Sequence, residues 1–246
     1  NGNYLAIVNK QSNTLQIFDS VSHAQIGSDV ISGSLPVAVS WSNTSTQLAV
    51  VNSGDNTVKV FNFNGLSIPT LSVSKFTGAN PSCVAWSLYG NYIAVTNAGS
   101  NTVQIFKAST LSQVGSSVVT GSIPSSVTWA TGDRFLAVTN MGSNTLQIFS
   151  FNGSSTPVLA ASNATGVTPS SVSWAQNGLF LSVANKDSNT LQIFSFDKNH
   201  ALALIDTVSS NYEPIATTWT PDGSYIGVSD HYSQKVQFLR FYNQSL

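Results

Sequence analysis

Ser-Asn-Thr-Leu-Gln-Ile-Phe occupies residues 12–18 and returns unchanged at residues 143–149 and 188–194. Near copies stand at residues 55–61 (Asp-Asn-Thr-Val-Lys-Val-Phe) and 100–106 (Ser-Asn-Thr-Val-Gln-Ile-Phe), with a divergent copy at residues 233–239. The second residues of the copies follow one another at steps of 43, 45, 43, 45 and 45 residues, and are Asn13, Asn56, Asn101, Asn144, Asn189 and Gln234. A fixed period of this length is the signature of a stacked or ring-closed repeat protein. The sequence therefore predicts one repeat domain, with a period of about 44, over residues 1–246.

Each period contains four short segments with strand character, named A to D in chain order. Segment A starts at a proline, ends at a tryptophan and alternates Val or Thr with small residues; its copies are residues 36–41, 81–86, 124–129, 169–174 and 214–219. Segment B is rich in β-branched and aromatic residues; its copies are residues 4–8, 47–51, 92–96, 135–139, 180–184 and 225–229. Segment C is the Thr-Leu-Gln-Ile-Phe end of the repeated stretch. Segment D is looser and is expected around residues 25–30, 70–76, 113–119, 157–161 and 202–208.

Four antiparallel strands in every repeat are typical of a blade of an all-β propeller. Packing blade on blade buries both faces of each sheet, which one blade cannot do alone. The chain holds six B–C hairpins but five A and five D segments, so six blade signatures are visible, either as a six-bladed ring or as part of a seven-bladed one. We expect a terminal blade that is incomplete, or completed by strands from both ends of the chain. An incomplete blade has a free edge, which favours self-association.

The repeat also resembles a known family. Residues 93–106 (Ile-Ala-Val-Thr-Asn-Ala-Gly-Ser-Asn-Thr-Val-Gln-Ile-Phe) are similar to the YVTN family of β-propeller repeats, and the Pro-Asp-Gly-Ser-Tyr of residues 221–225 resembles WD-repeat blades. The YVTN family occurs in surface-layer and other extracellular proteins and is related to lactonase-type propellers. The resemblance implies a propeller scaffold, commonly of seven blades, and leaves the function open. A lactonase relationship would imply a site at the central channel, but no cluster of acidic residues supports that.

Composition excludes several classes of function. Charged residues make up 8% of the chain and its net charge is −1, without a basic stripe that would bind nucleic acid. Apolar runs are too short for a membrane-spanning helix, so no membrane insertion is expected. Ser, Thr and Asn replace charges as the solvating residues, which is common in secreted and cell-surface β proteins. We therefore expect an extracellular or surface location.

Few residues are available for catalysis. The chain has one cysteine, Cys83, one glutamate, Glu213, and three scattered histidines. No metal-ligand spacing or Ser-His-Asp set emerges, so we expect no cofactor, no metal and no enzyme activity. Asp230 and His231 interrupt the repeat, which indicates either a local ligand or metal site or, as we favour, sequence drift in a terminal copy.

Two further repeated features have alternative interpretations. The five tryptophans that end the A segments could stack on sugars, as in a propeller lectin, or pack between blades; their position on an apolar-alternating strand favours the core. Cys83 could be a nucleophile, but it takes a position held elsewhere by Ala or Ser and is predicted to be a small core residue.

The B–C turns and the Gly-x-x-Pro loops from D to A are expected on one rim. That rim would present a repeated set of polar residues suited to binding polyols, glycans or protein loops, although plain turn chemistry also explains Asn there. The candidate site comprises Asn9, Asn13, Asn52, Asn56, Asn97, Asn101, Asn140, Asn144, Asn185, Asn189, Asp230 and His231. The sequence thus favours a non-enzymatic binding or scaffold module with protein or glycan ligands. The alternatives are a glycan-binding lectin and a lactonase-like hydrolase.

Overall fold

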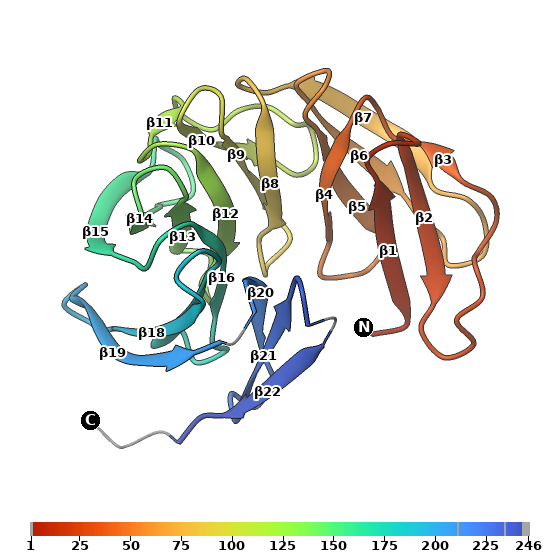
Figure 1. Cartoon of the computed structure of the whole chain (residues 1–246). Helices are drawn as coiled ribbons and strands as arrows, with labels where there is room; N and C mark the ends of the chain where they lie inside the picture. The colour runs from red at the N-terminus through yellow and green to blue at the C-terminus, as the bar shows by residue number, and fades with distance from the viewer. Residues whose placement is uncertain (1, 211, 234, 243–246) are drawn as a thin grey trace. The chain divides into compact units, whose positions relative to one another are not determined.

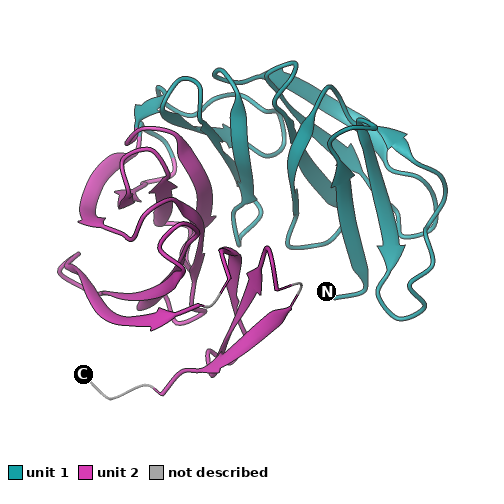
Figure 2. Ribbon diagram, viewed as in Figure 1, with its two compact units in different colours: residues 1–119, 154–156 teal, residues 120–153, 157–246 magenta. Residues whose placement is uncertain are grey.

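The computed structural model describes residues 2–210, 212–233 and 235–242, and its regular elements are β-strands (Figure 1). Gln234, the last residue of the period count, lies outside the described ranges. The chain divides into two compact units, residues 1–119 with 154–156 and residues 120–153 with 157–246 (Figure 2). In the described ranges, no helix has the length and apolar character needed to span a membrane.

The first unit holds three sheets, each an antiparallel meander. The first sheet has the order β1-β2-β3 and is formed by Tyr4–Asn9, Thr14–Asp19 and Val30–Ile31. The second has the order β4-β5-β6-β7 and is formed by Pro36–Trp41, Gln47–Asn52, Thr57–Asn62 and Thr70–Phe76. The third has the order β8-β9-β10-β11 and is formed by Pro81–Trp86, Tyr92–Asn97, Thr102–Lys107 and Val118–Val119.

The second unit holds three sheets of the same kind. The fourth sheet, β12 to β15, is formed by Pro124–Trp129, Phe135–Asn140, Thr145–Ser150 and Val158–Ala164. The fifth, β16 to β19, is formed by Pro169–Trp174, Phe180–Asn185, Thr190–Phe196 and Leu202–Ser209. The sixth, β20 to β22, is formed by Pro214–Trp219, Tyr225–Asp230 and Val236–Arg240.

These six sheets have the blade architecture that the repeat predicts. All five A strands have the predicted bounds. The two terminal sheets have three strands each in the described part of the chain, because the first has no A strand and the sixth has no D strand. Among the described residues, these two sheets are therefore one strand shorter than the other four.

The D strands of the first and third sheets differ from the prediction. They are two residues long, β3 and β11, where strands over residues 25–30 and 113–119 were expected. In both sheets the chain turns back after strand C through residues with positive φ, His23 and Leu111, and touches strand C at a single bridge before it turns again. The D strands of the other blades are seven or eight residues long and carry a bulge against strand C.

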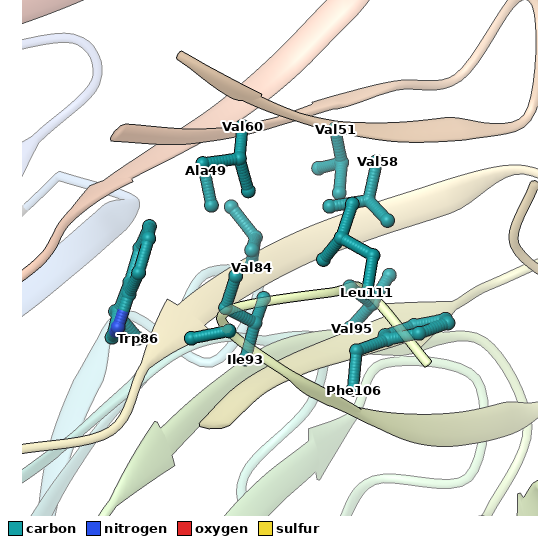
Figure 3. Close-up of a cluster of buried hydrophobic side chains, with 11 residues drawn as sticks. Ala49, Val51, Val58, Val60, Val84, Trp86, Ile93, Val95, Phe106 and Leu111 are labelled. Carbon is teal, nitrogen blue, oxygen red and sulfur yellow. The ribbon is translucent and has the colours of Figure 1, made fainter. Parts of the chain in front are cut away.

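The core lies between successive blades. Ala49, Val51 and Val58 of the second blade meet Val84 and Ile93 of the third, with Trp86 at one end of the cluster (Figure 3). The last residue of the repeated stretch is fully buried in blades two to five, as Phe61, Phe106, Phe149 and Phe194. Burying one such side chain contributes about 1.5–3 kcal/mol to the free energy of folding. The main role of the repeated stretch is therefore to pack the core.

Serines of the A strands add hydrogen bonds between blades. The backbone N–H of Trp86 donates to Ser40 Oγ at 3.0 Å, that of Val172 to Ser126 Oγ at 3.3 Å and that of Thr217 to Ser171 Oγ at 3.2 Å. These serines therefore link the A strand β4 to β8, β12 to β16 and β16 to β20.

Four of the five tryptophans are buried as predicted: Trp86, Trp129, Trp174 and Trp219 are 4–8% exposed. Trp41 is half-buried, although it packs against Tyr4 and Phe63. It belongs to the second blade and faces the first blade, which lacks an A strand in the described residues. The tryptophan that follows a missing A strand is thus the one left partly open.

Replacing Trp86 by Ala should lower the free energy of unfolding by about 3–5 kcal/mol, because it leaves a large cavity between two blades. Trp41→Ala, in the same unit, should cost clearly less because that ring is already half-exposed. Urea denaturation followed by circular dichroism measures both. Equal losses in the two variants would contradict the packing argument.

Candidate functional site

The B–C turns and the D–A loops of a blade are hydrogen-bonded to each other. The Gly54 N–H donates to Ser34 O at 3.0 Å, and the His231 N–H donates to Glu213 O at 3.0 Å. The same pairing recurs in the blades between. We call these turns and loops the rim segments of each blade; they lie on one side of the blade, as the sequence predicts.

The first Asn of each B–C turn is structural. Asn52, Asn97, Asn140 and Asn185 are fully buried, while Asn9 is half-buried. Asn97 Nδ2 donates to Gln104 Oε1 at 3.1 Å and to Thr102 Oγ1 at 3.2 Å, and the Gly78 N–H donates to the same Gln104 oxygen at 2.8 Å. The loop glycine is required, since a Cβ on Gly121 would lie 2.9 Å from the Asn140 side chain. The four buried amides are therefore covered by their own loops and cannot contact a ligand on the rim.

The second Asn links neighbouring blades in four of the turns. It adopts a left-handed conformation, with φ of 52° to 62°. Its side-chain oxygen accepts the N–H of the residue that precedes the next blade's proline. These pairs are Asn13 with Leu35 at 2.7 Å, Asn56 with Asn80 at 2.7 Å, Asn144 with Thr168 at 2.8 Å and Asn189 with Glu213 at 2.8 Å. Asn is favoured here because it tolerates positive φ and presents an acceptor. Ligand binding by these residues stays a prediction.

Asp230 takes the place of the buried Asn in the sixth blade. It is 5% exposed and accepts hydrogen bonds from Ser210 Oγ at 2.7 Å, Gln237 Nε2 at 2.7 Å and Ser233 Oγ at 3.2 Å. In the first, third, fourth and fifth blades the amide donates to the glutamine oxygen. A carboxylate can only accept, so here the glutamine presents its NH₂ group instead. Asp230 is thus an adapted member of the structural network.

His231 lies apart from Asp230, in a charged cluster on the rim of blades five and six. His231 Nδ1 and Lys186 Nζ lie 3.4 Å and 3.3 Å from the same oxygen, Oε2 of Glu213. Tyr212 and Tyr232 flank the cluster in sequence and are 53% and 67% exposed. We call these five residues the blade-six patch. Of these five residues, only His231 was predicted from the sequence. The other four differ from the small, uncharged residues that most other blades have at the same positions, and this difference could have revealed them.

The remaining titratable residues do not converge. In the described part of the chain, no three His, Cys, Asp or Glu side chains are placed to hold a metal ion. His200 stacks on Phe196 with 5.8 Å between ring centres, and His23 lies in the exposed turn of the first blade. Cys83 is half-buried on the A strand β8, paired with Thr96.

The turn acids are engaged locally. Asp222 accepts hydrogen bonds from Ser224 Oγ, Thr220 Oγ1 and the Ser224 N–H, which lower the pKa of its carboxyl to about 2. These hydrogen bonds within the Pro-Asp-Gly turn account for the presence of an aspartate at this position.

The blades and their rim segments have counterparts in known proteins. Antiparallel four-stranded blades with shared rim segments define a β-propeller. The chain belongs to the lactonase, seven-bladed β-propeller family, whose model matches residues 66–172 and 155–245. This confirms the resemblance read from the repeat. Six blade sheets are present in the described residues.

Solved structures agree on the fold. A functionally unknown protein from Desulfotomaculum acetoxidans superposes with a TM-score of 0.85 at 14% identity, covering 97% of this chain and 79% of that one. A chain of the mitotic checkpoint complex gives 0.85 at 14% identity, covering 98% and 72%. A Lactobacillus plantarum protein gives 0.76 at 14% identity, covering 96% and 80%. None of the curated proteins is significantly similar in sequence.

Asn144→Ala should lower the free energy of unfolding by about 2 kcal/mol, because it removes the hydrogen-bond acceptor and because alanine tolerates the left-handed conformation less well than asparagine. Asn144→Asp keeps both properties and should stay within about 0.5 kcal/mol of the wild type. Chemical denaturation provides the measurement. An alanine variant as stable as the aspartate variant would show that the contact between blades is not stabilising.

Asp222→Asn should change the pH dependence of stability. The folded pKa of Asp222 lies below the unfolded value of roughly 4, so its contribution is full above that pH and is lost as the pH falls towards 2. The difference in Tm between wild type and Asp222→Asn should therefore be largest above pH 4 and close to zero near pH 2. A difference that is constant across this range would contradict the assignment.

Proposed function

We propose that this chain is a non-enzymatic propeller module that binds a protein or glycan ligand through the blade-six patch. The observation that carries the proposal is the contact of Lys186 and His231 with Glu213, beside two exposed tyrosines. Most other residues of the rim segments are small and uncharged.

The repeat serves as an internal control. The backbone positions of Tyr212 and Glu213 hold Ser34-Leu35, Ala79-Asn80, Ser122-Ile123 and Val167-Thr168 in the other blades. The positions of His231 and Tyr232 hold Ser53-Gly54, Ala98-Gly99 and Met141-Gly142 in blades two to four. The same turns form with those residues, so the blade geometry requires neither an aromatic nor a charged residue there. We therefore attribute the aromatic and charged residues at these positions to ligand binding.

The chemistry of the patch suits recognition of a neutral, polar surface. Tyrosine offers an apolar ring with a hydroxyl group, a combination enriched at binding surfaces. Lys186 donates hydrogen bonds, Glu213 accepts them and His231 can do either. The positive and negative groups nearly balance, which favours glycans and uncharged protein loops over nucleic acid. We also propose an extracellular or surface location, which the low content of charged residues supports.

The proposal is tested by converting the patch to the third blade's sequence. In the variant, Tyr212→Ala, Glu213→Asn, His231→Ala and Tyr232→Gly reproduce a rim that the fold already uses. Wild type and variant are applied to a glycan array and to a displayed library of extracellular peptides. Binding by the wild type should fall at least tenfold in the variant, whereas the matched control Ala79→Ser/Ala98→Ser on blade three, which introduces the serines of blade two, should bind like the wild type.

The competing candidate is a lactonase-like hydrolase, favoured by the family match. A panel of γ- and δ-lactones, followed by acid release at constant pH, addresses it. Turnover that is lost on Glu213→Gln, or a wild type that binds neither array nor library, would overturn the binding proposal.

A further inference from the structure

The first residue of strand B is aromatic in five of the six blades and is glutamine, Gln47, in blade two. Three of the aromatic rings pack on the phenylalanine that follows strand C of the next blade in the same unit. The distances between ring centres are 5.0 Å for Tyr4 and Phe63, 5.1 Å for Phe135 and Phe196, and 5.0 Å for Phe180 and Phe241. An aromatic pair is therefore the usual filling at this end of a blade junction.

The junction between blades two and three lacks both members of this pair. Gln47 replaces the ring of strand B, and Ala108 stands in blade three where blades two, four, five and six have phenylalanine. Ala108 is 6% exposed and packs in the apolar cluster between these two blades. A cavity of about 360 Å³ lies beside Gln47. An amide and a methyl group fill less space than two rings, so this junction keeps an opening that the aromatic pairs occupy elsewhere.

The cavity has a polar but uncharged lining. It includes the side-chain amides of Gln47, Asn62 and Asn64 and the apolar side chains of Phe63 and Ile68, and none of its lining residues is charged. Small-ligand sites have volumes of about 300–1,000 Å³ and combine apolar surface with a few polar groups that orient the ligand. The size and lining of this cavity therefore suit a small, neutral ligand.

Gln47 and Asn62 together present one acceptor and one donor to the cavity. They lie directly opposite each other in the register of β5 with β6, so their side chains share one face of the sheet. Gln47 Nε2 donates to Asn62 Oδ1 at 2.9 Å. This bond leaves the Gln47 oxygen and the Asn62 NH₂ group without a partner among the described residues. Thr70, opposite Asn62 on β7, adds a hydroxyl group to the lining.

The loop on the other side of the cavity is held by contacts within the first unit. Asn64 Oδ1 accepts hydrogen bonds from the N–H groups of Leu66 and Ser67, at 2.9 Å and 3.0 Å. Ile68 lies against the first blade, where a Cβ on Gly27 would collide with its side chain. The loop is thus fixed before a ligand arrives, which reduces the entropy lost on binding.

We propose that this cavity, the blade-two pocket, binds a neutral sugar ring. One hydroxyl group of the sugar donates to the Gln47 oxygen and a neighbouring hydroxyl accepts from the Asn62 NH₂ group, while apolar C–H groups of the ring meet Phe63 and Ile68. Sugars with an acidic or basic group are disfavoured, because their charge would lose hydration without gaining a partner. The pocket belongs to the first unit, and the inference does not rest on the blade-six patch.

Blade four provides the residues for the test. It has Phe135 and Ser150 at the positions of Gln47 and Asn62, so Gln47→Phe and Asn62→Ser introduce residues that the fold already uses. The full chain is titrated with glucose, galactose, mannose and N-acetylglucosamine, and binding is followed by NMR. We expect saturable binding of at least one sugar, weakened at least tenfold by Gln47→Phe and about fivefold by Asn62→Ser. The matched control Ser150→Asn, which keeps Phe135, should bind like the wild type.

Four outcomes would overturn the inference. The first is the absence of saturable binding for all four sugars, and the second is unchanged affinity in both pocket variants while their Tm values show that they are folded. The third is tighter binding of glucuronate or glucosamine than of the neutral sugars. The fourth is loss of sugar binding in the quadruple variant of the blade-six patch, which would assign the sugar to that patch and support the proposed function instead.

Discussion

An asparagine side-chain oxygen accepts a hydrogen bond from the backbone N–H of the next blade's loop, and this contact links successive blades within each unit. Asn56 reaches the N–H of Asn80, and Asn144 reaches that of Thr168, each from a left-handed turn. The recipient residues also have positive φ and precede a proline, a conformation that disfavours most side chains. The asparagine oxygen thus stabilises a strained loop and positions the proline from which the next A strand starts. The A strand that begins at this proline then pairs with strand B and contributes its tryptophan to the core.

Each residue of the repeated stretch has its own structural task, which is why the stretch recurs almost unchanged. The asparagine links blades, the threonine and glutamine complete a buried amide network, and the apolar residues fill the core. Lys59 replaces the glutamine in the second blade and pairs with Asp55 at 4.0 Å, while Asp230 reverses the network in the sixth. Variation in this network is therefore compensated within the same blade, whereas the charged residues of the blade-six patch pair across the turns of two blades.

Local patterns predicted the A, B and C strands well, because proline, β-branched alternation and Asn turns act over a few residues. The D strands of the first and third blades were misplaced, since His23 and Leu111 are not typical turn formers. The steps of 43 residues, against 45 elsewhere, mark these same two copies and could have revealed the shorter strand. Burial of Asn97 depends on Gln104 and Gly78, and the contact of Lys186 with Glu213 joins distant segments. No local pattern encodes such pairs.

Within each unit, the contacts between blades connect nearest neighbours, through one asparagine and one set of apolar side chains at the junction. Stability in such an array is approximately a sum of blade terms and junction terms, as in a one-dimensional chain of coupled units. Within each unit, the middle blade takes part in two such junctions and the three-stranded sheet in one. Coupling between neighbouring blades, rather than the strength of any one sheet, therefore sets the cooperativity with which each unit unfolds.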